Sequence, residues 1–318
     1  MPTVGLDLGG TNIYGLVLDD DGEATASVKL RTPTAGDRLV VVDVLEAAVR
    51  AVCDDAGIAV DDLAAVGVGT PGLVMDGTVG GASNVPGWSE RFALADTLRD
   101  RVGVPVRVAN DVTAAAVAEH RVGAAHGFDN VLVVFVGTGV GAGMILHGRP
   151  YEGAFGGAGE FGHTVVAMHG AVCPCGRRGC VEAYAGRRAM ERAAERAVSN
   201  GTTTVLFETM EKMGKSRPTS GVFRAALEAG DDLTASLLHE AIGALGAGIG
   251  SAVNLLDVDA VVMGGGLADK LGDWFLIRVE SALRPHLFQQ PPQVRMLAAQ
   301  LGDAAGATGA ALLAADGT

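Results

Sequence analysis

Three of the four cysteines of the chain lie within eight residues, in the segment "CPCGRRGC" at 173–180. Cys173, Cys175 and Cys180 have the short spacing of a zinc knuckle, in which thiolates hold the ion and a fourth ligand completes a tetrahedron. A thiol-redox role fits less well, because Cys-x-Cys is not the Cys-x-x-Cys motif of an oxidoreductase. Cys53, in an apolar helical stretch, is most simply a core residue. The spacing therefore predicts a zinc site.

Two histidines compete for the fourth ligand position. His169 stands four residues before Cys173, and His163 stands ten residues before it. Loop length alone favours His169. His163 ends the glycine-rich segment "GAGEFGH" (157–163), in which Glu160 lies three residues earlier.

Three glycine-rich turns follow predicted strands: "DLGGTN" (7–12), "VGTGVG" (136–141) and "VMGGGLAD" (262–269). Glycine lets the backbone approach an anion, and successive amides with a Thr hydroxyl can cradle phosphate oxygens. None of the three is a Walker loop or a G-x-G-x-x-G fingerprint. Each alone could be a tight turn, but three at strand ends favour nucleotide binding. Asp7 could hold Mg²⁺ through water.

The pair Asn110-Asp111 stands where a predicted strand ends, which is where ligand crevices form in open α/β sheets. A carboxylate there could take the proton from a substrate hydroxyl that attacks phosphorus. The alternative is structural, with Asp111 or Thr113 capping the next helix.

Two turn-rich loops, "GTPGLV" (69–74) and "SNVPGW" (83–88), contain further candidates for a binding site. Asn84 could bind a hydroxyl and Trp88 could wall a pocket. A surface turn with a half-buried Trp explains the second loop equally well.

The composition limits the classes of partner. The chain has 318 residues, 48% of them hydrophobic and 19% charged, with a formal net charge of −13. Nucleic acid is excluded as a partner, since a phosphate backbone is held by clustered Lys and Arg. The N-terminus has no export signal, and the most apolar stretch (131–146) is too short and too rich in glycine to span a membrane. Cysteines without an export signal point to the cytoplasm.

Strands and helices alternate along the chain, which predicts an α/β protein. Helices are predicted at 37–56, 182–198, 232–256 and 304–316. A strand, a Gly/Thr break and a second strand occur in "VGLDLGGTNIYGLVLDDDG" and again in "VLVVFVGTGVGAGMILHG". This repetition predicts two related α/β halves that face a cleft.

In these motifs the chain resembles the ROK family (repressor, open reading frame, kinase), and within it the bacterial ATP-dependent glucokinases. The resemblance runs nearly end to end, from "DLGGTN" to "GDAAGATGAALLA". Its most specific part is "GEFGH" followed by "CPCGRRGCVE". It implies an actin-like (ribonuclease H-like) duplicated two-domain fold. The smaller domain is expected at 1–112 plus 303–318, and the larger one, with the zinc knuckle, at 113–302.

The resemblance also implies roles for individual residues. Asp111 would be the general base on the 6-hydroxyl of glucose. The residues expected to bind the sugar are Gly72, Asn84, Asn110, Asp111, Glu160, His163 and Glu182. Those expected to bind ATP and its Mg²⁺ are Asp7, Gly9, Gly10, Thr11, Asn12, Gly137, Thr138, Gly139, Gly264 and Gly265. The structural zinc ligands would be His163, Cys173, Cys175 and Cys180, so the resemblance overrules His169.

The chain departs from the family at Asn12, where many relatives carry Lys, so no catalytic lysine is assigned. The first predicted strand starts by residue 3, which leaves no room for the helix-turn-helix of the family's repressors. The alternatives are a kinase for another hexose or N-acetylhexosamine, a kinase that uses polyphosphate, and a sugar-sensing regulator. The family also implies a homodimer or homotetramer.

Overall fold

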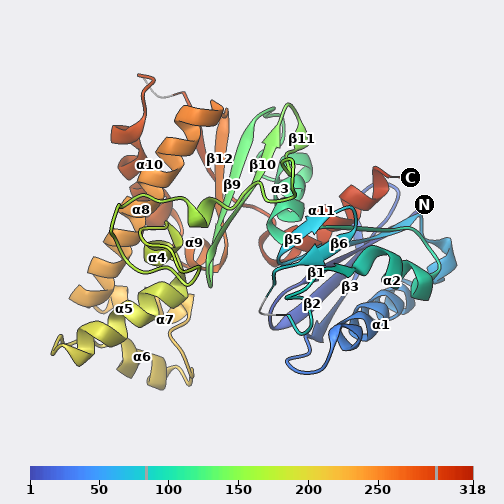
Figure 1. Ribbon diagram of the computed structural model, residues 1–318, viewed down its shortest axis with the longest axis horizontal. Coiled ribbons are helices and arrows are strands. Elements are labelled where there is room, and N and C mark those ends of the chain that lie inside the picture. Colours follow the sequence, from blue (N-terminus) through green and yellow to red (C-terminus); the bar gives the residue numbers. More distant parts are fainter. Residues whose placement is uncertain (83–84, 291–292, 318) are drawn as a thin grey trace. The chain divides into compact units, whose positions relative to one another are not determined.

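The computed structural model describes residues 1–82, 85–290 and 293–317 and divides the chain into two compact units (Figure 1). The first unit contains Met1–Gly127, Gly143–Gly159 and Asp303–Thr318, and the second contains Phe128–Ala142 and Glu160–Gly302. This partition differs from the boundary expected at residue 112, because residues 113–127 and 143–159 cluster with the first unit.

A five-stranded mixed sheet of order β3-β2-β1-β4-β8 forms the centre of the first unit. Its strands are β1 (Thr3–Leu8), β2 (Asn12–Leu18), β3 (Ala24–Arg31), β4 (Ala65–Thr70) and β8 (Val106–Asn110). Strands β1 to β3 pair antiparallel, as the short turns between them require, whereas β4 and β8 run parallel to β1. The carboxyl ends of β1, β4 and β8 therefore lie at one edge of this sheet.

Helices cover both faces of that sheet, so β1 and β4 are buried almost continuously. Leu6 and Val68 pack with Leu45 of α1 in one apolar cluster. At the alternate positions Gly5 and Gly67 meet α11, where an added Cβ would lie 1.9 Å from a backbone oxygen of that helix. The helices are α1 (Arg38–Ala56), α2 (Leu94–Val102), α3 (Asp111–Val122) and α11 (Ala305–Ala315).

The smaller elements of this unit are a 3₁₀ turn and a three-stranded sheet of order β5-β6-β7. They are η1 (Val60–Asp62), β5 (Leu73–Met75), β6 (Thr78–Gly80) and β7 (Phe92–Ala93). Trp88 is fully buried in the core, with its ring 6.5 Å from that of Phe92. Both interpretations of Trp88 from the sequence, a pocket wall and a half-buried surface turn, are therefore wrong.

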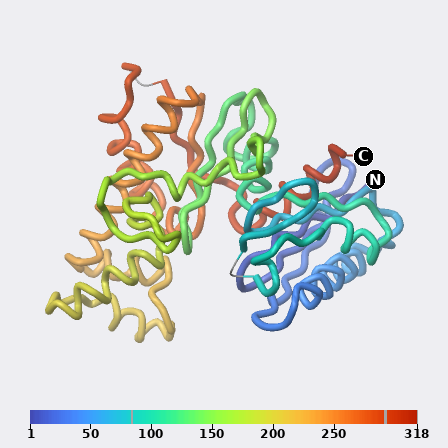
Figure 2. Tube along the Cα trace, viewed as in Figure 1, coloured from blue at the N-terminus to red at the C-terminus, as the bar shows by residue number. Residues whose placement is uncertain are grey.

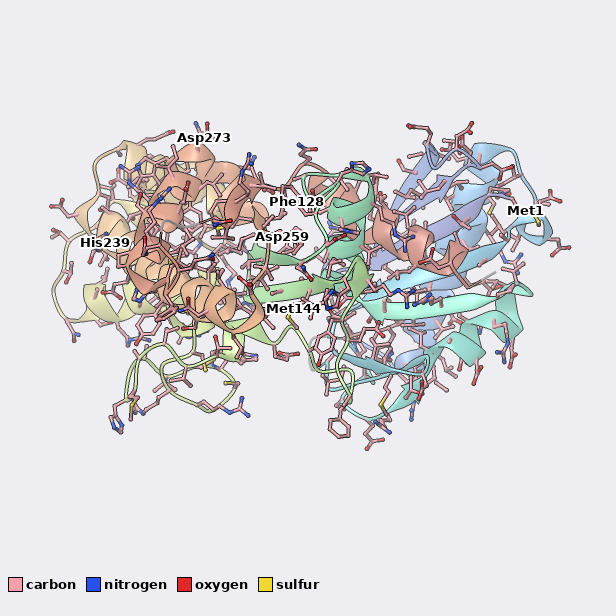
Figure 3. All side chains as sticks on the ribbon, turned by 90° about the horizontal axis from the view of Figure 1, so that it is seen from above. Met1, Phe128, Met144, His239, Asp259 and Asp273 are labelled. Carbon is pink, nitrogen blue, oxygen red and sulfur yellow. The ribbon has the colours of Figure 1, made fainter. Side chains whose placement is uncertain are left out.

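The second sheet has the order β11-β10-β9-β12-β13, and β12 runs parallel to both β9 and β13. Its strands are β9 (Val131–Val136), β10 (Val140–Leu146), β11 (Arg149–Pro150), β12 (Ala260–Gly264) and β13 (Arg295–Ala298). Asp259, labelled in Figure 3, accepts hydrogen bonds from the backbone and side-chain amides of Asn130 at 2.8 and 3.3 Å. This contact joins the starts of β9 and β12. The repeated strand–Gly/Thr–strand pattern is confirmed, since β1-β2 and β9-β10 are neighbours in their sheets.

The remaining elements are mostly helices of the second unit, which the tube in Figure 2 traces from yellow-green through orange to red. They are η2 (Phe161–His163), α4 (Glu182–Ala185), α5 (Arg187–Ser199), α6 (Leu206–Lys212), α7 (Ser220–Glu228), α8 (Asp232–Leu256), α9 (Gly266–Leu271), α10 (Asp273–Leu283), η3 (Arg284–His286) and η4 (Gly302–Ala304). Among the described residues, α8 is the one helix long and apolar enough to cross a membrane. It packs against α10, α4 and α5, and 56% of its apolar window is buried, which is typical of a core helix.

Candidate active site

Three carboxylates of the first unit lie close enough to interact: Asp7 at the end of β1, Asp111 at the start of α3, and Asp303 in η4. Burial, and after it the negative charges of Asp111 and Asp303, together raise the pKa of Asp7 to about 7. Perturbed carboxylates of this kind are typical of functional sites, and their oxygens are the ligands that Mg²⁺ prefers. Asp7 is therefore the candidate to hold Mg²⁺ through water.

Asn110 and Asp111 have different local roles. The side-chain oxygen of Asn110 accepts hydrogen bonds from the backbone N–H groups of Val112 (3.0 Å) and Thr113 (3.2 Å), so Asn110 caps α3. The expectation that Asp111 or Thr113 is the cap is therefore wrong. The side-chain amide of Asn110 also donates to the carbonyl of Gly72 at 3.1 Å.

Gly72 needs to be glycine. Its φ is +98°, and an added Cβ would lie 2.6 Å from the carbonyl oxygen of Gly80. Its position fixes the loop after β4 beside Asn110, so Gly72, Asn110 and Asp111 are gathered at one sheet edge. Asn84, the other sugar-binding candidate of this unit, lies outside the described residues.

The turn at 9–12 is a tight connection between β1 and β2. Gly9 N–H donates to the Asn12 carbonyl at 3.0 Å, and the hydroxyl of Thr32 donates to the Gly9 carbonyl at 2.6 Å. Gly10 and Thr11 remain exposed at its tip. Gly306 of α11 lies so near Asp7 that an added Cβ would meet the carboxyl carbon at 2.7 Å. The C-terminal helix therefore helps to enclose Asp7.

His163, Cys173, Cys175 and Cys180 form the candidate metal centre of the second unit. Their ligand atoms all lie within 4.8 Å of one another. The Sγ atoms of Cys175 and Cys180 are 3.7 Å apart, and Sγ of Cys173 is 3.8 Å from Nδ1 of His163. A tetrahedral ion with Zn–S bonds of about 2.3 Å keeps its sulfurs roughly 3.8 Å apart, so the residues fit zinc. His169 is not part of this cluster.

Burial raises the pKa of the Cys173 thiol to about 12 and raises that of Cys180, whereas the backbone N–H of Arg177 lowers the pKa of Cys175. Two of the three thiols are therefore poor thiolates by themselves. A cation at the centre supplies the charge that stabilises them as ligands.

The imidazole of His163 has two different neighbours. Nδ1 faces Cys173, and Nε2 lies 3.8 Å from the carboxylate of Glu160. The ring therefore joins the cysteine cluster to an exposed carboxylate. With Nδ1 committed to a metal, Nε2 carries the proton and can donate it in a hydrogen bond.

Glu182, the first residue of α4, lies two residues after Cys180 and reaches the turn that follows β9. Its Oε2 accepts from the Val140 N–H at 3.0 Å, and an added Cβ on Gly139 would lie 2.3 Å from the same oxygen. The structure thus brings Glu182 against the expected phosphate turn at 137–139.

Two further glycines of the second unit leave no room for a side chain. Gly265 has a φ of +88°, and an added Cβ would lie 2.7 Å from the Val136 nitrogen. An added Cβ on Gly264 would lie 2.6 Å from the Cβ of Ala299 and 2.9 Å from the ring of Phe135. They bring the start of α9 next to the end of β9.

Sequence reasoning missed Arg187. Its guanidinium donates to the hydroxyl of Thr138 at 3.0 Å and to that of Ser220 at 3.4 Å. The only sequence signal was a basic residue near the knuckle, which does not distinguish Arg187 from Arg188.

The fold and these sites define an α/β protein of the actin-like class, built on two sheets with strand–glycine turn–strand units. A family model described as the ROK family matches residues 3–317, and the chain belongs to that family.

Named relatives cover almost the whole chain. It is 35% identical to the glucokinase of Streptomyces coelicolor, over 98% of this chain and 97% of the relative. It is 31% identical to an N-acetylmannosamine kinase of Escherichia coli, over 99% and 98%. The crystal structure of a ROK family glucokinase from Streptomyces griseus in complex with glucose and AMPPNP is similar, with a TM-score of 0.82, 35% identity, and coverage of 99% of this chain and 100% of that one.

Proposed function

We propose that the chain is a glucokinase, which transfers the γ-phosphoryl group of ATP to the 6-hydroxyl of glucose. The observation that carries the proposal is the position of Asp111, at the sheet edge beside Asp7 and next to the cap Asn110. Support comes from the Streptomyces coelicolor relative, a glucokinase, and from the similar Streptomyces griseus enzyme in complex with glucose and AMPPNP.

The chemistry needs a base and charge neutralisation. An alcohol is a poor nucleophile at neutral pH, and Asp111 is proposed to accept the proton of the 6-hydroxyl as that oxygen attacks phosphorus. Asp7 is proposed to hold the Mg²⁺ of the nucleotide through water. When bound, this ion neutralises charge on the phosphoryl group. The remaining work of the protein is to orient the two substrates.

The residues proposed to bind the sugar are those that the family resemblance indicates. They are Gly72, Asn84, Asn110 and Asp111 of the first unit, and Glu160, His163 and Glu182 of the second. The zinc ligands His163, Cys173, Cys175 and Cys180 are proposed to orient the imidazole rather than take part in chemistry. The phosphates are assigned to the turns at 9–12 and 137–139, and the nucleoside to Gly264 and Gly265.

The same proposal extends to the setting of the enzyme. We infer a cytoplasmic enzyme that acts on glucose and ATP, forms a homodimer or homotetramer, and binds neither nucleic acid nor membrane. The acidic net charge of −13 supports the absence of nucleic acid binding.

A coupled assay over a panel of hexoses tests the proposal, with ATP and polyphosphate as alternative donors. Glucose with ATP should give the highest kcat/KM. The second candidate is an N-acetylmannosamine kinase, favoured by the 31% identical relative from Escherichia coli. Higher kcat/KM with N-acetylmannosamine would select that candidate, and no turnover with any sugar would refute the kinase.

A further inference from the structure

Arg187 is the first residue of α5 and lies against the expected phosphate turn of the second unit. Its backbone N–H donates to the Gly137 carbonyl at 3.0 Å, and that of Arg188 donates to the Thr138 carbonyl at 3.2 Å. The start of α5 therefore holds this turn in place. The first two backbone N–H groups of α5 are occupied by the carbonyls of this turn. An anion would therefore have to be bound by the Arg187 side chain.

The guanidinium of Arg187 joins two hydroxyl groups. Nη2 donates to Thr138 at 3.0 Å and Nη1 to Ser220 at 3.4 Å. A hydroxyl has one proton to donate, and a hydroxyl that accepts from arginine can direct this proton elsewhere. Thr138 is exposed, so its proton is available to an acceptor such as a phosphate oxygen.

Ser220 connects this contact to the start of α9. Ser220 is 5% exposed, and its Oγ lies 3.6 Å from where a Cβ on Gly266 would stand. Gly266 directly follows Gly264 and Gly265, the two glycines assigned to the nucleoside. Arg187 thus lies between the turn assigned to phosphate and the helix start assigned to the nucleoside.

The positive charge of Arg187 has no carboxylate partner within ion-pair distance in the described ranges of the chain. Glu191, whose charge acts on Arg187, instead accepts hydrogen bonds from both Nε (3.0 Å) and Nη2 (2.8 Å) of Arg217. Burial lowers the pKa of Arg187 from its usual value, although the group remains a cation at neutral pH. Of its five N–H donors, two have partners among the residues that the structure describes, which leaves three to bind an anion.

We propose that Arg187 binds a phosphate group of the nucleoside triphosphate, together with the hydroxyl of Thr138. This inference rests on the proposed kinase function, and it adds a basic phosphate ligand in a chain whose other phosphate turn (7–12) has no basic residue. The planar fork of arginine suits two phosphate oxygens at once.

Calorimetric titration of the full-length protein with ADP, adenosine and glucose tests the role of Arg187. Arg187→Gln should weaken ADP binding roughly 10- to 100-fold, as expected for lost hydrogen bonds to a charged group. Adenosine and glucose should bind as to the wild type, and KM for ATP should rise more than KM for glucose. Arg187→Lys should recover part of the ADP affinity, because it keeps the charge but not the fork.

Arg188→Gln is the matched control. Arg188 is adjacent and exposed, and its backbone N–H is the group that contacts the turn in the described part of the chain, so ADP affinity should change less than about 3-fold. The proposal is overturned if Arg187→Gln binds ADP like the wild type. It is also overturned if ADP and adenosine weaken equally, which indicates a structural role, or if the wild type binds no ADP.

These outcomes are separate from the fate of the kinase proposal. A wild type that phosphorylates glucose while Arg187→Gln keeps full ADP affinity refutes only the role of Arg187. A wild type that phosphorylates no sugar, but loses ADP affinity on Arg187→Gln, refutes the glucokinase and supports the phosphate site.

Discussion

Two adjacent residues at the end of β8 show how one short segment combines structure and chemistry. Asn110 caps α3 and binds the Gly72 carbonyl. Asp111 accepts from the Val112 N–H at 2.9 Å and lies near Asp7. Because Asn110 meets the capping requirement of the helix, the carboxylate of Asp111 is not needed for that purpose.

Asp111→Asn should reduce kcat by at least about 100-fold, since an amide cannot accept the proton of the sugar hydroxyl. Glucose affinity should stay within about 3-fold of the wild type, because an amide keeps hydrogen-bonding capacity at this position. Coupled-assay rates and calorimetric titration with glucose measure the two effects. Asp61→Asn, an exposed carboxylate of the same unit, should change neither. An active Asp111→Asn enzyme would remove Asp111 from the role of base.

The contribution of Asp7 to the free energy of unfolding should fall as the pH rises. Its pKa in the folded protein is about 7, above the usual 3.8, so the native state holds a proton that the unfolded chain loses between these pH values. The stability contributed by Asp7 is therefore fully present below about pH 4 and is lost as the pH rises through 7.

Asp7→Asn should consequently raise Tm at pH 8, on the order of 5 °C, with a smaller difference at pH 5. Activity should fall at both pH values. Calorimetric melting across this range, without divalent cations, measures the effect, and Asp61→Asn again serves as the control. A pH-independent difference in Tm would contradict the pKa assigned to Asp7.

At the scale of elements, hydrophobic patterning predicted most of the secondary structure, because strand and helix periods are local properties of the sequence. The predicted helices at 37–56, 232–256 and 304–316 match α1, α8 and α11. The helix predicted at 182–198 is instead broken at Gly186. The break lets the amides of Arg187 and Arg188 reach the turn after β9, a long-range contact that a local pattern does not contain.

The same contrast between local patterns and long-range contacts applies to the site residues. Loop length favoured His169 as the fourth metal ligand, whereas the structure groups His163 with the cysteines. The chain between His163 and Cys173 folds back so that Val165 pairs with Cys180 in an isolated bridge. Sequence separation is therefore a poor guide to distance here. Arg187 was missed for the same reason, since its partners Thr138 and Ser220 are far away in sequence.

Helix α11 should be intolerant of added volume where it meets α3. An added Cβ on Gly309 would lie 1.7 Å from the Ala114 carbonyl oxygen, so Gly309→Ala must push the two helices apart. Overpacking of this kind costs about 1–3 kcal/mol or more. Gly243→Ala in α8 is the matched control, because nothing lies within 4 Å of its added Cβ. It should stabilise the protein by roughly 0.5–1 kcal/mol.

Denaturant unfolding of both glycine variants measures these free energies. A Gly309→Ala protein as stable as the wild type would show that α11 and α3 can separate at little cost. Destabilisation by Gly243→Ala would show that this face of α8 is covered in solution.

At the scale of the molecule, the first unit is assembled from three separate segments of the chain. Residues 303–318 return to it as α11, which packs on β1, β4 and α3 and encloses Asp7 through Gly306. The expected grouping of the two chain ends came from the family resemblance rather than from local patterns. In the structure the two chain ends are joined because α11 packs closely on the sheet at Gly5 and Gly67.

The proposed zinc centre should affect the affinity for glucose more than the affinity for the nucleotide. A zinc ion held by the cluster would fix Nδ1 of His163 and anchor Cys180, two residues before Glu182, so its removal should free two proposed sugar ligands. Loss of such supporting contacts typically costs 10- to 100-fold, so glucose affinity should fall by roughly that factor after chelation. ADP affinity should change less than about 3-fold, because Arg187 and Thr138 keep their own contacts.

The two histidines of the same loop provide the decisive pair of variants. His163→Ala should lose both bound zinc and glucose affinity, whereas His169→Ala should keep both, because His169 is exposed and outside the cluster. Metal content by elemental analysis and calorimetric titration with glucose and ADP separate the two effects. If the chelated protein bound glucose as tightly as the zinc-loaded protein, the centre would be remote from the sugar. If ADP affinity fell as far as glucose affinity, the contact of Glu182 with Val140 would make the centre a support for both substrates.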